Sequence, residues 1–143
     1  MTSTGADEPG TESPLASLCA VLRDLRAALA AARPALAGDA VRELAEGALL
    51  EVQSELTVAR RDTDLLLAAA CAEVGRRSGP ERGAGGLARK NGFDDPGKMI
   101  AAATGGSRRD ANDLIQAGRA MAEAEERRRR EEEAHKAGAP APE

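Results

Sequence analysis

The sequence predicts an all-α protein with a long antiparallel helix pair, a small helix-turn-helix-like cluster and a charged C-terminal helix. Apolar side chains recur every three, four or seven residues over long stretches, which is the spacing of one helical face. Ser, Asp and Pro stand where these stretches begin, and Gly or Pro stands where they end. A segment rich in Gly separates the pair from the cluster.

The helix pair is expected over residues 13–77. Ser13 and Pro14 have the form of an N-cap followed by proline in the first turn. Pro34 limits the first helix because the residue before a proline disfavours helical geometry. A second helix is expected from Asp39 to the end of this segment, and the first helix is expected to fold back on it. Its near-heptad stripe, typical of a coiled coil, consists of Val41, Leu44, Ala48, Val52, Leu56, Ala59, Leu66, Ala70 and Val74.

The second half of the chain is expected to contain shorter helices and one charged helix. Asp95 and Pro96 start one helix, and Ser107 caps the last one with Asp110 three residues later. The buried face of that last helix is expected to contain Ala111, Leu114, Ile115, Gly118, Met121 and Ala122. The expected segments are a disordered leader at 1–12, the helical hairpin at 13–77, a Gly-rich loop at 78–86, the cluster with its extended charged helix at 87–136, and a disordered tail at 137–143.

The composition predicts a thin core. The chain contains 32 alanines and a single aromatic residue, Phe93. Alanine buries little apolar area, so each buried position contributes less than a leucine would at about 25 cal/mol per Å2. Marginal stability, or completion of the core by a partner segment, is therefore expected.

The inventory of reactive side chains predicts no catalytic centre, no metal site and no cofactor. The chain has no tyrosine, one histidine and two cysteines. His135 lies near the C-terminus without a second ligand nearby, and Cys19 and Cys71 stand among apolar residues without zinc-binding spacing. The acidic first residues do not form a secretory signal, and no apolar run is long enough to span a membrane. A cytoplasmic protein without a membrane partner is expected.

A candidate nucleic-acid surface lies on the last helix. Ala101, Gly105, Ala111 and Leu114 meet the requirement of a helix-turn-helix for small and apolar residues around its turn. Its outward face is expected to carry Arg108, Arg109, Asn112 and Gln116, which can reach phosphates or base edges. The neighbouring Asp110 and Asp113 would repel DNA. A helical hairpin of the core is the favoured interpretation, and DNA contact is the alternative.

The charged residues 123–136 predict a solvated helix and not a nucleic-acid patch. They include six acids against five Arg and Lys residues, and several Glu residues precede an Arg by four positions. The GxGxxA string at Gly83, Gly85 and Ala88 is not interpreted as a dinucleotide site, because no strand precedes it.

Two motifs of small residues stand in the cluster: Leu87, Ala88 and Gly92, followed by Thr104, Gly105, Ser107 and Ala111. With the long helix before them, they resemble the helical domain of unknown function that precedes HNH endonuclease domains in a large actinobacterial family, the REP-type repeat proteins. The resemblance covers about half of the chain, from about Leu49 to Met121. No residue here matches the catalytic or metal-binding residues of that nuclease domain.

The resemblance implies a non-catalytic module that associates with nucleic acid or supports a nuclease domain. Expected partners are DNA, or a second copy or nuclease domain bound through the helical stripe. The alternatives are a helical oligomerisation or protein-interaction module, and a truncated fragment without function.

Overall fold

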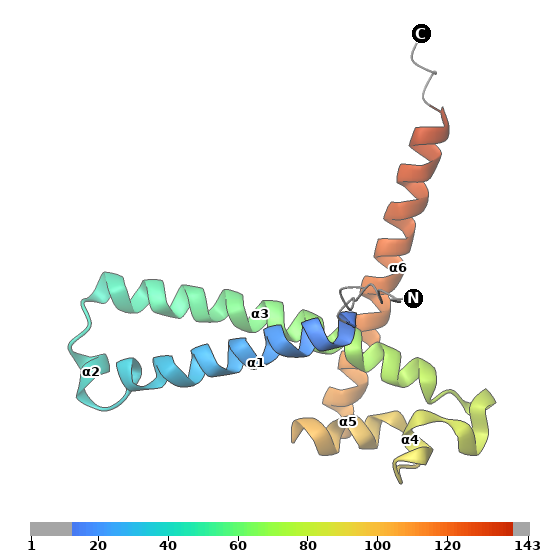
Figure 1. Ribbon diagram of the computed structural model, residues 1–143, viewed down its shortest axis with the longest axis horizontal. Helices are drawn as coiled ribbons and strands as arrows, with labels where there is room; N and C mark the ends of the chain where they lie inside the picture. The colour runs from blue at the N-terminus through green and yellow to red at the C-terminus, as the bar shows by residue number, and fades with distance from the viewer. Residues whose placement is uncertain (1–12, 139–143) are drawn as a thin grey trace, which may run out of the picture. The chain divides into compact units, whose positions relative to one another are not determined.

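The computed structural model describes residues 13–138, which contain helices and no strand (Figure 1). The predicted all-α class is therefore confirmed for these residues. The predicted leader at 1–12 and residues 139–143 of the predicted tail lie outside the described part. The chain divides into two compact units, Met1–Gln53 and Ser54–Glu143. Because the predicted helical hairpin pairs residues of both units, it stays a prediction.

The first unit contains α1 (Pro14–Ala32), the 3-10 helix η1 (Arg33–Leu36), α2 (Asp39–Arg42) and the beginning of α3 (Glu46–Arg77). As predicted, α1 has Ser13 at its N-cap and Pro14 in its first turn. Its C-cap is Arg33, the residue before Pro34, where the helix was expected to end. Arg33 itself keeps helical dihedral angles, and the chain continues into η1 with Pro34 in its first turn, so proline did not exclude helical geometry at the preceding residue.

The expectation of one continuous helix from Asp39 was wrong. The helix stops after Arg42 and a new one starts at Glu46. Two features favour this break. Gly47 costs about 1 kcal/mol relative to alanine inside a helix, and less where a helix begins. An acidic side chain such as Glu46 is favourable in a first turn, where the helix dipole is positive.

The second unit contains the rest of α3, the 3-10 helix η2 (Pro80–Gly85), α4 (Leu87–Lys90), α5 (Pro96–Thr104) and α6 (Arg108–Gly138). The segment 78–86, predicted as a loop, includes η2, in which Gly83 has a positive φ of 51°. The charged helix continues to Gly138, so residues 137 and 138, predicted to belong to the disordered tail, are helical. Favourable spacing of acidic and basic side chains sustains a helix without a core.

The core lies in the second unit and is small. Its buried apolar residues are Ala68, Cys71, Ala88, Ile100, Ala111 and Ile115. The cluster around Cys71 and Ile115 also contacts the partly buried Val74, Ala101 and Leu114. Of the predicted buried face of α6, Ala111, Ile115 and Gly118 are buried, Leu114 and Met121 are half-buried, and Ala122 is exposed. The predicted thin core is present.

Gly118 lies at the point where α6 meets α3. A Cβ atom built on Gly118 would overlap the carbonyl group of Ala68 and lie 2.7 Å from the Cβ of Ala72. The two helix backbones therefore approach each other more closely there than any side chain would allow. On the same face of α3, Gly75 lies against Ile115, whose Cγ2 would be 3.2 Å from a Cβ built at Gly75.

Candidate functional site

The turn between α5 and α6 is built from local hydrogen bonds. Gly105 adopts a left-handed conformation with φ 73°, and its N–H donates to the Ala101 carbonyl at 2.9 Å. Ser107 N–H and Oγ donate to Asp110 Oδ2 at 2.9 and 2.7 Å, and the Asp110 N–H donates back to Ser107 Oγ at 3.1 Å. These bonds, led by that of the Ser107 N–H, lower the pKa of the Asp110 carboxyl. The predicted cap is confirmed, and α5 packs against α6 (Figure 1).

The four candidate nucleic-acid residues do not share one environment. Arg108 Nη2 forms an ion pair with Asp95 Oδ2 at 3.0 Å. Asn112 lies against the first turn of α5, since its Oδ1 would be 2.8 Å from a Cβ built on Gly97. All four residues, Arg109 and Gln116 included, are exposed on the helix surface. The structure therefore brings Arg108 and Asn112 together at α5 and leaves the other two pointing to solvent.

Asp95 connects the starts of the two helices. Its Oδ1 accepts a hydrogen bond from the Lys98 N–H at 2.9 Å, which caps α5, and its other oxygen holds Arg108. The sequence indicated the cap through the Asp-Pro pair. It gave no signal for the ion pair, because that contact depends on how α5 packs on α6.

Replacing Asp95 tests this double role. Asp95→Ala should lower the free energy of unfolding by about 1–2 kcal/mol, because it removes the cap and the partner of Arg108. Asp95→Asn should cost less than about 1 kcal/mol, because asparagine caps helices equally well and only the ion pair is lost. Urea unfolding followed by circular dichroism measures both. Equal midpoints for wild type and Asp95→Ala would contradict the assigned cap.

Positive charge is concentrated around the core of the second unit. Residues 68–122 carry nine Arg and Lys side chains and six Asp and Glu side chains, a net charge of +3, whereas the whole chain carries −4. The remainder of the chain is therefore strongly acidic. This asymmetry is favourable to an anionic ligand at the helix-turn-helix-like cluster.

Apolar side chains stand exposed along α1 and along α3. No residue of α1 is buried, and Cys19, which stands among apolar residues in the sequence, is only half-buried. Large aliphatic side chains with exposed fractions from 37% to 67% occur at Leu15, Leu18, Val21, Leu25 and Leu29 of α1 and at Leu49, Leu50, Leu56, Val58, Leu65, Leu66 and Leu67 of α3. Each helix thus presents a large exposed apolar surface.

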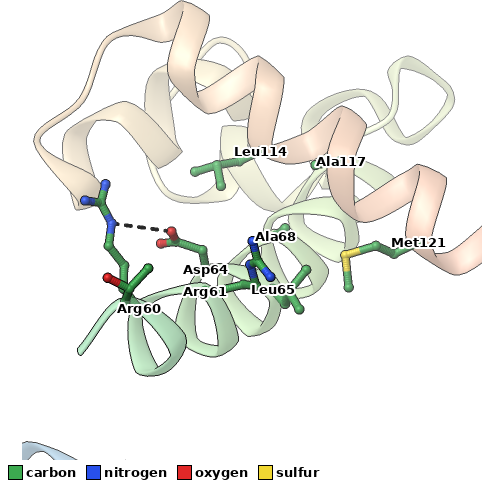
Figure 2. A pocket seen from close by; sticks show the side chains of 9 residues that line it. Arg60, Arg61, Asp64, Leu65, Ala68, Leu114, Ala117 and Met121 are labelled. Carbon is green, nitrogen blue, oxygen red and sulfur yellow. Dashed lines mark ion pairs between the residues drawn. The ribbon is translucent and has the colours of Figure 1, made fainter. Parts of the chain in front are cut away.

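A groove in the second unit adds to this surface. It lies between α3 and α6 and has a volume of about 480 Å3. Figure 2 shows Leu65 and Met121 on opposite walls, and the ion pair of Arg60 with Asp64, 3.7 Å long, at the α3 edge. The lining residues are Thr57, Arg60, Arg61, Asp64, Leu65, Ala68, Leu114, Ala117 and Met121. A methionine in such a wall can adapt its shape to different apolar contacts.

A cluster of charged side chains lies in the last turns of α3. Glu73 accepts hydrogen bonds from Arg76 Nε and Nη2 at 2.8 and 2.6 Å and from Arg77 Nε at 2.7 Å. The two bonds from Arg76, and then the one from Arg77, lower the pKa of the Glu73 carboxyl from 4.5 to about 2.

This shift predicts a pH dependence of stability. A carboxyl with a lowered pKa in the folded chain stabilises it fully above pH 4.5, and that contribution is lost as the pH falls toward 2. Glu73→Gln should therefore show a shallower loss of stability over this pH range than wild type, most clearly at low salt. Thermal melts followed by circular dichroism at several pH values measure it. Parallel curves for the two proteins would contradict the assigned hydrogen bonds.

The described residues contain no group of three or more His, Cys, Asp or Glu side chains that could hold a metal ion. His135 is exposed on α6, and burial raises the pKa of the Cys71 thiol. Over residues 13–138, no helix has both the length and the apolar content needed to span a bilayer.

Comparison with known proteins finds no family model, no curated protein and no solved structure that matches this chain. The resemblance to the domain that precedes HNH nucleases stays a prediction.

Proposed function

We propose that this chain is a helical interaction module, which binds another polypeptide through the apolar side chains of α1 and α3. The observation that carries the proposal is the exposure of twelve large aliphatic side chains on these two helices. Apolar surface of this extent on a small protein is typical of an interface. Removing apolar area from water is favourable by about 25 cal/mol per Å2, and the entropic cost of association offsets part of this gain.

The stability of α1 supports the same conclusion. This helix has 19 residues, none of them buried. In proteins, most of the stability of a helix comes from tertiary packing of its apolar face and not from helix propensity. A partner that covers Leu18, Leu25 and Leu29 would supply the packing that α1 lacks.

Photo-crosslinking in cells tests the proposal on the full chain. A photoreactive amino acid at Leu18 lies on the apolar side of α1, whereas the same amino acid at Asp24 lies on the opposite side. Discrete crosslinked products are expected from position 18 and not from the matched position 24. The same low yield from both positions would contradict an interface on this helix.

Nucleic-acid binding by the helix-turn-helix-like cluster is a second candidate. The net charge of +3 over residues 68–122 favours it, as does the exposure of Arg109 and Gln116 at the start of α6. The resemblance to nuclease-associated helical domains points to the same ligand class. Since Arg108 is held by Asp95, Arg109 is the more available cation.

Gel-shift assays at low salt distinguish this candidate. Arg109→Glu should weaken binding of a DNA duplex by roughly tenfold or more, because a phosphate contact becomes a repulsion. Arg127→Glu makes the same charge change in the exposed part of α6 and should have a much smaller effect. No retardation of DNA by the wild-type chain at micromolar concentration would exclude the candidate.

A further inference from the structure

We infer that the polypeptide that covers α3 is a second copy of this chain, whose α3 lies parallel to the first. The inference rests on the proposed function and names its partner. Within the single helix α3, first and fourth heptad positions follow one another from residue 49 to residue 70. They are Leu49, Val52, Leu56, Ala59, Thr63, Leu66 and Ala70. All are exposed except Val52, which is half-buried.

Polar atoms do not oppose contact along this row. Thr63 is its one polar residue, and its Oγ1 donates to the Ala59 carbonyl at 2.8 Å. The hydroxyl is therefore satisfied inside the helix, and the threonine can offer its methyl group to a partner. Ala59 and Ala70 are small enough to let two helices approach closely.

The charges beside the row favour a second copy. Glu55 immediately precedes the first-position Leu56, and Arg60 immediately follows the fourth-position Ala59. In a parallel pair of helices, the residue that precedes a first position lies next to the residue five positions later on the partner helix. Glu55 of one copy would therefore lie next to Arg60 of the other. Two symmetric Glu55–Arg60 pairs would form across the dimer. Within the chain, Arg60 forms an ion pair with Asp64 at 3.7 Å, and the two side chains are 85% and 58% exposed. Such an exposed ion pair is weak, so Arg60 can leave Asp64 and pair with Glu55 of the second copy.

The same charges oppose an antiparallel arrangement. In antiparallel helices, each flank of the apolar row faces the same flank of the partner. The flank that carries Glu55 also carries Asp62, so acids would face acids. A parallel pair avoids this repulsion.

The row from residue 49 to residue 70 is about 33 Å long at 1.5 Å per residue. It spans three heptads, which is near the lower limit for a coiled coil. A weak dimer whose population depends on concentration is therefore expected.

Sedimentation equilibrium of the full chain, from about 10 µM to about 1 mM, tests the inference. Glu55→Arg and Arg60→Glu alone each replace two attractive contacts by two repulsive ones and should raise the dimer dissociation constant about tenfold. The combined variant restores opposite charges and should dimerise like wild type. Since both side chains are exposed, circular dichroism should show unchanged helix content in all three variants.

A wild-type chain that stays monomeric throughout this range would overturn the inference. So would charge variants that dimerise like wild type, or a combined variant no better than the single ones. These results leave the proposed function standing if position 18 still crosslinks to a different protein. Loss of face-specific crosslinking would instead contradict the proposed function itself.

Discussion

Gly118→Ala is expected to lower the free energy of unfolding of the second unit by about 3 kcal/mol, at the upper end of the usual cost of overpacking. The added methyl group would overlap the carbonyl group of Ala68 and press on Ala72. The overlapping atom belongs to the backbone of α3, so it cannot turn away as a flexible side chain would. Relief requires α3 and α6 to separate, and separation would loosen the contacts around Ile115.

Urea unfolding followed by circular dichroism measures this effect, with Gly47→Ala as the matched control. Within 4 Å, a Cβ on Gly47 would meet no atom beyond the two neighbouring residues and the nearby backbone of its own helix. That substitution should be neutral or stabilising by up to about 1 kcal/mol, because alanine favours helix. If Gly118→Ala changed the free energy of unfolding no more than Gly47→Ala, the close approach of α3 and α6 at Gly118 would be contradicted.

Ile115→Ala is expected to cost about 2–4 kcal/mol, the usual range for truncating a buried isoleucine. Ile115 is only 5% exposed and belongs to the cluster that contains Cys71 and Ile100. In a core this small, one lost side chain is a large part of the total. The thermal unfolding transition of the Ile115→Ala variant should therefore become broad and shift to a much lower temperature than that of wild type.

Leu66→Ala is the comparison for Ile115→Ala, since it removes a similar aliphatic side chain that is 57% exposed. In dilute protein it should cost less than about 1 kcal/mol, because little buried area is lost. The two variants are compared by thermal melts at low protein concentration. Equal costs would mean that the apolar surface of α3 is already covered within the chain.

Local features of the fold could be predicted from the sequence because local chemistry determines them. Asp95 before Pro96, Gly105 after α5 and Ser107 with Asp110 set their helix ends through hydrogen bonds that span four residues or fewer. The expected buried positions Ala111, Ile115 and Gly118 were right for a related reason, since one helical face carried all three.

Contacts between distant segments could not be predicted in this way. Periodicity identifies the apolar face of a helix but not whether a neighbour covers it. The predicted stripe therefore gave no sign that Leu56 and Leu66 would remain exposed while Cys71, on the same helix, is buried. The ion pair of Arg108 with Asp95 was missed for the same reason, and it changes which side chains of the candidate nucleic-acid surface are available.

Hydrogen exchange of the purified chain, at a concentration where it is monomeric, tests the central claim most directly. If the apolar faces of α1 and α3 are covered only when a partner binds, the amides of α1 in the monomer should exchange nearly as fast as those of an unfolded peptide. Those around Cys71 and Ile115 should be protected by the global stability of the second unit. Protection of α1 equal to that of the core in the monomer would show that its leucines are buried within the chain, and would contradict the account.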